Sequence, residues 1–322
     1  MNCNGKRILL IINPRAGMTI TNIKIEKLTS KLEARGGIVT PYLTGYAKHC
    51  ERLVRELGQE HDVVMCSGGD GTLNEAVTGL HSLAGKPKIS YIPTGTTNVF
   101  GRTFRLPSTS DAAVAVLCGG LSKKLDYGIM NGNRVFTFVC SFGAFTNVSY
   151  STSQDTKNVL GMGAYLFDGI ATLRDIRPYR AKITTAAGDV YEDEFIFGAV
   201  TNAPQFAGVL KIPQKVVNPS DGLFELMLIK YPKTPYELTD TLHQLIYQQY
   251  DRSKTLLLHS SRFTMEFEEN TPFTVDGEYA GEHKTVIAEN KMRAMELIVP
   301  PDTITETLLG MIPEDWLLPG IK

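Results

Sequence analysis

A glycine-rich turn joins a strand pattern to a helix pattern in the stretch Ser67-Gly68-Gly69-Asp70-Gly71-Thr72-Leu73-Asn74-Glu75. The apolar run Asp62–Cys66 precedes it, and apolar residues at helical spacing follow it over Leu73–Leu83. Glycines let backbone N–H groups approach an anion closely, and a helix N-terminus adds partial positive charge. The stretch therefore predicts a phosphate-binding turn, although glycines that merely reverse the chain are the plainer alternative. Thr72 and Glu75 also have the spacing of a capping box at the helix start.

Two further polar loops follow strand patterns in the same part of the chain. The segment Asn13-Pro14-Arg15-Ala16-Gly17 follows the strand pattern Arg7–Ile12, and Thr94–Asn98 follows Ile89–Pro93. Open α/β sheets bind ligands at the carboxyl ends of their parallel strands. Each loop alone is unremarkable as a connection, but the three loops together predict one ligand crevice.

The fold class is an α/β N-terminal domain with a parallel sheet, followed by a mostly antiparallel β-sandwich. The predicted domains are residues 1–128 and residues 129–301, with residues 302–322 packing back on the first domain. Helical patterns are expected near residues 158–176 and 234–250. The remaining strand patterns are Val39–Leu43, Arg134–Cys140, Arg180–Thr185, Phe195–Thr201, Phe224–Lys230, Arg262–Phe267 and Glu296–Val299.

Composition excludes several classes of protein. The 322 residues carry 33 Lys plus Arg and 34 Asp plus Glu, a net charge of -1, so the basic excess of a nucleic-acid binder is missing. Five cysteines without a C-x-x-C pair fit the reduced cytoplasm. No apolar run approaches the roughly 18 residues that span a bilayer, so we expect any membrane contact to be peripheral. No Walker P-loop motif and no complete Rossmann glycine motif is present.

The ordered set of motifs resembles the diacylglycerol kinase catalytic-domain family, which includes bacterial soluble lipid kinases and sphingosine kinases. Gly-Gly-Asp-Gly-Thr alone is shared with NAD kinases and phosphofructokinases, whereas the whole set is specific and runs through most of the chain. The motifs that carry the resemblance are Asn-Pro-x-x-Gly at 13–17, Gly-Gly-Asp-Gly-Thr at 68–72 with Asn74-Glu75, Gly-Thr-x-Asn at 95–98, Asp126, Asp221-Gly222 and Asp276-Gly277-Glu278.

The resemblance implies Mg²⁺ and ATP as cofactors, with ATP in a cleft between the two domains. Asp70 would act through Mg²⁺ and its waters, and Asp126 would support that site. The positions that match nucleotide-binding residues of the family are Asn13, Pro14, Arg15, Ala16, Gly17, Thr44, Gly68, Gly69, Asp70, Gly71, Thr72, Leu73, Asn74 and Thr94.

Two acidic turns extend the likeness. Glu278 matches the residue that accepts the proton of the lipid hydroxyl, and Asp276 competes with it for that role. An exposed Asp-Gly hairpin turn is the plainer reading of these residues. Asn218, Asp221 and the carbonyl of Leu223 match a structural magnesium site of some bacterial members, and a simple turn explains them equally well.

The expected function is a lipid kinase that phosphorylates a lipid hydroxyl, most simply diacylglycerol to phosphatidic acid. The expected location is the cytoplasm, in peripheral contact with the inner face of the membrane. A NAD kinase-like enzyme and a nucleotide- or lipid-binding protein without turnover are the alternatives.

Val99 stands where the family usually has Asp, which puts the acceptor and turnover in question. The apolar segment Val159–Ile176 is a candidate for acyl-chain binding or for core. The oligomeric state is open, with a homodimer among the options.

Overall fold

The computed structural model describes residues 2–16, 25–144, 177–203, 205–206, 210–212, 217–247 and 250–301. The chain divides into two compact units. Unit 1 comprises Met1–Tyr127 and the segment that begins at Arg293, and unit 2 comprises Gly128–Met292. Strands β5 (Leu121–Met130) and β15 (Glu278–Val299) therefore contribute residues to both units.

Unit 1 contains a parallel sheet. Strand β1 pairs in parallel with β2 and β3, and β3 pairs in parallel with β4. Strand β15 also joins this sheet, because its residue Leu297 pairs in parallel with Ile89 of β4. The elements of this unit besides β5 and β15 are β1 (Arg7–Ile12), α1 (Ile25–Glu33), β2 (Ile38–Leu43), α2 (His49–Leu57), a 3₁₀ turn (Gly58–Glu60), β3 (Val63–Gly68), α3 (Asp70–His81), β4 (Lys88–Pro93), α4 (Val99–Thr103) and α5 (Ser110–Gly119).

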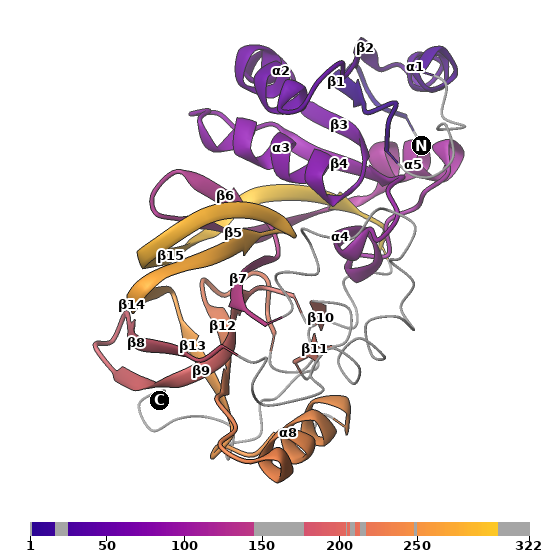
Figure 1. Cartoon of the computed structure of the whole chain (residues 1–322). Helices are drawn as coiled ribbons and strands as arrows, with labels where there is room; N and C mark the ends of the chain where they lie inside the picture. The colour runs from indigo at the N-terminus through magenta and orange to yellow at the C-terminus, as the bar shows by residue number, and fades with distance from the viewer. Residues whose placement is uncertain are drawn as a thin grey trace. The chain divides into compact units, whose positions relative to one another are not determined.

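Helices cover this sheet because β1 and β3 are apolar on both faces. Side chains of α1 and α5 share one buried cluster with alternate residues of β1, namely Leu28, Leu32, Val114, Leu117, Ile8, Leu10 and Ile12. Helices α2 and α3 lie on the other side of the sheet (Figure 1). They approach closely, since a Cβ added at Gly79 of α3 would lie 2.7 Å from Cβ of Val54 in α2. Cys3 and Cys118 form a disulfide in this unit, so the expectation that all five thiols are reduced is wrong for this pair.

Unit 2 is antiparallel, as the alternating patterns predicted. Its long strands bend, so that each pairs with different neighbours along its length. Strand β9 pairs with β8 through its first half and with β7 and β12 through its second, and β14 pairs with β8, β7 and β15. The elements are β6 (Arg134–Phe136), β7 (Val139–Gly143), β8 (Tyr179–Thr185), β9 (Val190–Thr201), β10 (Gln205–Phe206), β11 (Leu210–Lys211), β12 (Phe224–Lys230), α8 (Pro235–Tyr247), β13 (Thr255–Ser260) and β14 (Arg262–Val275).

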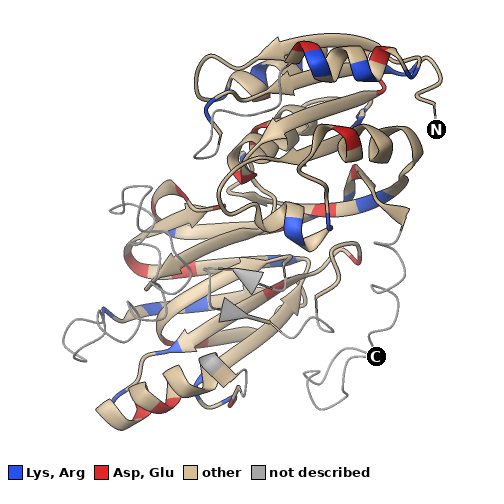
Figure 2. Ribbon diagram, turned by 90° about the vertical axis from the view of Figure 1, so that its right-hand side faces the viewer, with Lys and Arg blue, Asp and Glu red and all other residues tan. Residues whose placement is uncertain are grey.

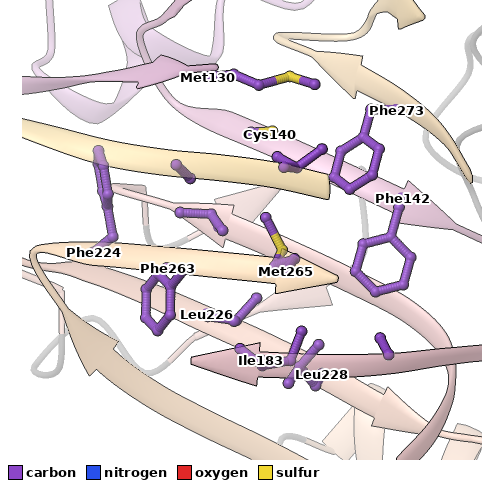
Figure 3. Close-up of a cluster of buried hydrophobic side chains, with 14 of the residues drawn as sticks. Met130, Cys140, Phe142, Ile183, Phe224, Leu226, Leu228, Phe263, Met265 and Phe273 are labelled. Atoms are coloured by element: carbon purple, nitrogen blue, oxygen red, sulfur yellow. The ribbon is translucent and has the colours of Figure 1, made fainter. Parts of the chain in front are cut away.

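The pairings of β7, β9, β8 and β14 form a closed circuit around one apolar core, rather than two separate sandwich sheets. Figure 3 shows side chains from several of these strands in that core, with Phe142 beside Phe273. The ring centroids of these two residues are 5.5 Å apart. The aromatic and β-branched residues that favour strands are the same residues that fill this core.

Several element boundaries differ from the sequence-based expectation. The predicted strand Arg134–Cys140 is divided into β6 and β7, because Thr137 and Phe138 bond to a side chain instead of continuing the ladder. Strands β14 and β15 extend far beyond the predicted Arg262–Phe267 and Glu296–Val299 and form one long hairpin. The expected helix near 158–176, and residues 302–322, which were expected to pack back on the first domain, lie outside the described residues.

Charged residues of both signs are interspersed over the ribbons of the two units (Figure 2). This distribution agrees with the balance of 33 basic and 34 acidic residues. Among the described residues, no helix is long and apolar enough to cross a membrane.

Candidate functional site

The three polar loops of unit 1 are hydrogen-bonded to one another. The carbonyl oxygen of Gly68, at the end of β3, accepts hydrogen bonds from the backbone N–H groups of Thr94 (2.8 Å) and Gly95 (3.2 Å) that follow β4. The Tyr91 hydroxyl donates to the same oxygen at 3.1 Å. Because β3 and β4 are adjacent and parallel, both loops leave the sheet at the same edge.

Close contacts within and between these loops leave no room for a side chain at two of the glycines. A Cβ added at Gly95 would lie 2.5 Å from Cα of Gly69, and one added at Gly68 would lie 2.2 Å from Oγ1 of Thr72. Such distances exclude any larger residue without a backbone shift. Close packing is therefore a reason for these glycines in addition to ligand approach and chain reversal.

Asn13 joins the loop after β1 to the glycine-rich turn. Its Nδ2 donates to Oγ1 of Thr72 at 3.0 Å, and its backbone N–H donates to the Ser67 carbonyl at 2.8 Å. Its Oδ1 accepts the backbone N–H of Arg15 at 3.0 Å, which shapes the Pro14–Ala16 turn. Thr44, at the end of β2, donates its N–H to the Ile12 carbonyl at 2.9 Å. Gly17 lies outside the described residues.

Asp70 begins α3 and is largely buried. Its Oδ2 accepts the backbone N–H of Val99 at 3.0 Å, and its Oδ1 accepts that of Phe100 at 3.2 Å. Burial raises the pKa of Asp70, while these two N–H groups and the nearby charge of Arg102 oppose the rise. Position 99 therefore contacts Asp70 through its main chain, a contact that does not depend on the Val99 side chain.

Asn98 closes the loop before α4. It has a left-handed backbone conformation (φ 47°), and its side chain exchanges hydrogen bonds with Gly95, receiving the Gly95 N–H at 2.9 Å and donating to the Gly95 carbonyl at 2.6 Å. Asparagine tolerates this conformation better than most residues. The remaining positions predicted to bind nucleotide, Gly71, Thr72, Leu73 and Asn74, lie in the first turns of α3.

The predicted capping box at the start of α3 is wrong. Gly69 precedes the helix without a side-chain cap, and Glu75 instead accepts backbone N–H groups of Lys48 (2.8 Å) and Cys50 (3.1 Å) at the start of α2. A carboxylate is well suited to the exposed N–H groups and partial positive charge of a helix N-terminus. Glu75 thus ties α3 to α2.

Asp126 is buried in β5, with 2% of its surface exposed. Its Oδ1 accepts the backbone N–H of Arg293 at 2.6 Å, where the chain of β15 adopts a left-handed conformation (φ 49°). A charge-assisted hydrogen bond at an irregular strand position stabilises that conformation. Asp126 therefore holds β15 at Arg293, whatever further role it has.

In unit 2, both carboxylate oxygens of Asp276 accept hydrogen bonds from the residues that connect β6 to β7. Its Oδ2 accepts the N–H (2.7 Å) and hydroxyl (2.8 Å) of Thr137, and its Oδ1 accepts the N–H groups of Phe138 (3.1 Å) and Val139 (3.0 Å). Burial raises the pKa of Asp276, and the four donors oppose that rise. Because both carboxylate oxygens are occupied, Asp276 has a structural role that its position beside Gly277 did not reveal.

Glu278 is placed differently, although it lies only two positions further on. Asp276 (φ 48°) and Gly277 (φ 85°) form the left-handed turn between β14 and β15, and Glu278 is the first residue of β15. Its side chain is 70% exposed, and its Oε2 lies 3.2 Å from Nη2 of Arg134. The expected Asp-Gly hairpin turn is therefore present, and it presents a carboxylate to solvent. Arg134 belongs to none of the sequence motifs.

The Asn218–Leu223 segment is organised by its own backbone. Oδ1 of Asn218 accepts the Ser220 N–H at 3.2 Å, and Oδ1 of Asp221 accepts the Leu223 N–H at 2.9 Å. The Leu223 carbonyl accepts Nδ2 of Asn290 at 3.1 Å. One carboxylate is a sparse donor set for Mg²⁺, which prefers six oxygen ligands. The geometry favours a turn, and magnesium binding there stays a prediction.

Comparisons with known proteins place these features in a wider group. Residues 7–130 match the family model described as diacylglycerol kinase catalytic domain. The chain is 30% identical over 318 residues to a diacylglycerol kinase of Staphylococcus aureus (strain JH9), covering 95% of this chain and 96% of that one. It is 28% identical over 279 residues to a diacylglycerol kinase of Bacillus subtilis (strain 168), covering 86% and 91%.

A solved structure has a similar fold. The crystal structure of a diacylglycerol kinase from Bacillus anthracis str. Sterne superposes with a TM-score of 0.70 at 22% identity, covering 93% of this chain and 98% of that one. The likeness therefore extends over both units and is not restricted to the glycine-rich turn.

Proposed function

Because this chain belongs to the diacylglycerol kinase catalytic-domain family, we propose that it transfers the γ-phosphate of Mg-ATP to the hydroxyl of diacylglycerol, giving phosphatidic acid. The observation that carries the proposal is the 30% identity to a diacylglycerol kinase across 95% of the chain. A NAD kinase-like activity would account for the glycine-rich turn alone, but not for a likeness that includes the whole of unit 2.

The joined loops of unit 1 are the proposed nucleotide site. Backbone N–H groups at the start of α3, with Asn13 and Thr94, would bind the phosphates. The partly buried Asp70 carboxylate is held by two N–H groups and offers the oxygen ligands that suit Mg²⁺ or its waters, with Asp126 in support. Bound Mg²⁺ would neutralise charge on the transferring phosphoryl group.

Glu278 is the proposed base. As the lipid hydroxyl oxygen bonds to the γ-phosphorus, the bond from phosphorus to the bridging oxygen of ADP breaks, and the hydroxyl proton passes to the Glu278 carboxylate. Asp276 is unsuited to this role because four donors occupy its oxygens. A lipid acceptor also requires peripheral contact with a membrane surface.

The first test is phosphorylation of lipid by the purified protein. The protein would be incubated with Mg²⁺, γ-labelled ATP and diacylglycerol in mixed micelles, with a bacterial lipid extract and NAD as alternative acceptors. Asp70→Ala and Glu278→Gln should lower the rate about 10²–10⁴-fold. Asp111→Asn, which changes an exposed carboxylate paired with Lys31, is the matched control and should retain full activity.

The acceptors distinguish the alternatives. Labelled phosphatidic acid supports the proposal, and a labelled product from NAD alone contradicts it. Binding of ATP without a labelled product from any acceptor indicates the non-catalytic alternative that Val99 suggested.

A further inference from the structure

We propose that Arg134 is a positioning residue that holds the Glu278 carboxylate in the orientation needed to accept the hydroxyl proton, an inference that rests on the proposed function. Arg134 is the first residue of β6, and its Nη2 donates to Oε2 of Glu278 at 3.2 Å. Among the described residues, no donor contacts Oε1 of Glu278. One carboxylate oxygen is therefore held, and the other is available to a substrate hydroxyl.

Hydrogen bonds of Asp276 join the backbone segments that carry Arg134 and Glu278. The left-handed turn at Asp276 and Gly277 fixes the start of β15, from which Glu278 projects. The Asp276 carboxylate binds Thr137, Phe138 and Val139, the residues that directly follow β6. Arg134 and Glu278 therefore extend from two strands that the Asp276 hydrogen bonds hold side by side.

The Glu278 side chain itself needs a partner to have one orientation. It is 70% exposed, so packing does not select among its rotamers. Glutamate is among the side chains that lose most rotamer entropy when they are immobilised. Formation of the Arg134 hydrogen bond before substrate binds would meet part of this cost in advance, and correct placement of a catalytic group has large effects on rate.

The ion pair between Arg134 and Glu278 contributes little to the stability of the fold. The side chain of Arg134 is 34% exposed and that of Glu278 is 70% exposed, and ion pairs this exposed contribute little to stability. The Nε–H of Arg134 is buried without a hydrogen-bond partner among the described residues, which is unfavourable. A methionine of similar length would remove both interactions, so Arg134→Met should fold as well as the wild type.

The test is a double-mutant cycle on phosphorylation of diacylglycerol in mixed micelles. Arg134→Met should lower kcat about 10- to 100-fold, while KM for ATP and lipid changes less than about twofold. Arg134→Lys should recover part of the loss, since an ammonium also donates to a carboxylate. In a Glu278→Gln background, Arg134→Met should cause no further loss, because its effect acts through the carboxylate.

The matched control is Arg180→Met. Arg180 is also in unit 2 and makes a comparably exposed ion pair with Glu268, at 3.3 Å. It should retain wild-type kcat and melting temperature.

Each outcome bears on one proposal. Full activity of Arg134→Met, an equal fold-loss in both backgrounds, or a loss of activity that follows a fall in melting temperature would overturn the role of Arg134. Full activity of Glu278→Gln would instead overturn the proposed base. A Glu278→Gln enzyme that is inactive beside a fully active Arg134→Met enzyme would leave the proposed function intact and remove only this inference.

Discussion

Asp276 and Glu278 show how strongly environment separates two carboxylates of one turn. Asp276 is partly buried and accepts four hydrogen bonds, three of them from consecutive backbone N–H groups. Glu278 is exposed and accepts one hydrogen bond, from Arg134. Local sequence does not distinguish them, because the donors to Asp276 come from residues 137–139, which are remote in the chain. The first carboxylate organises the corner, and the second remains available for chemistry.

Replacement of Asp276 by Asn tests its structural role. Asparagine has one acceptor oxygen, and its NH₂ group would face N–H donors, so we expect the free energy of unfolding to fall by about 2–4 kcal/mol. Urea unfolding followed by circular dichroism measures the change. Asp189→Asn, in an exposed hairpin turn, is the control. Wild-type stability of Asp276→Asn combined with a loss of activity would assign Asp276 to the chemistry instead.

At the scale of elements, the apolar patterns predicted strands well, while buried polar residues were harder to interpret. Strand β12 has the predicted bounds Phe224–Lys230, and its alternate residues Phe224, Leu226 and Leu228 fill the core. Glu225 lies on the opposite face of the same strand, and only 1% of its surface is exposed. It is opposite His259 of β13 and Thr201 of β9, and Asp221 is also near enough to affect its charge.

Burial of Glu225 predicts a pH-dependent stability. Burial raises its pKa from 4.5 to about 7, despite the opposing effect of His259. The folded state therefore binds the proton more tightly than the unfolded state. The free energy of unfolding should be highest below pH 4.5, decrease as the pH rises toward about 7, and stay constant above that. Across this pH range, ionisation of Glu225 should lower the free energy of unfolding by about 3 kcal/mol in total.

Glu225→Gln should therefore raise the melting temperature at pH 8 and leave it nearly unchanged at pH 4.5. Thermal unfolding of both proteins across this range measures the effect. Glu192→Gln, at a 58% exposed position of β9, is the control and should not alter the pH profile. A Glu225→Gln protein that is less stable than the wild type at pH 8 would show that the charged carboxylate is favourable.

At the scale of the whole molecule, connections between distant parts of the chain define the units. Strand β15 supplies Leu297 to the parallel sheet of unit 1 and residues 278–289 to the antiparallel pairing of unit 2. The Cys3–Cys118 disulfide links positions 115 residues apart within unit 1. Neither connection has a local sequence signal, because each depends on residues that meet only after folding.

The disulfide predicts a count of thiols and a loss of stability on reduction. Cys50, Cys66 and Cys140 are buried free thiols, so the denatured, unreduced protein should react at three cysteines of the five present. Closing a loop of this length stabilises a fold by about 4–5 kcal/mol in the chain-entropy model. Cys118→Ser should therefore lower the melting temperature, and reductant should lower that of the wild type but not of the variant. Reaction at all five thiols would contradict the disulfide.

Motifs and periodicity sufficed for the family, the kinase class, many of the strands in both units and the three loops at one sheet edge. Apolar spacing reflects the face that each element buries, and a parallel strand order places loop ends together. The contact of Thr72 with Asn13, the capping of α2 by Glu75, the length of β14 and β15, and the separate roles of Asp276 and Glu278 were not accessible in this way. Each depends on hydrogen bonds between residues far apart in the chain. Tertiary contacts decide which polar groups are satisfied and which remain available, and no local pattern records those contacts.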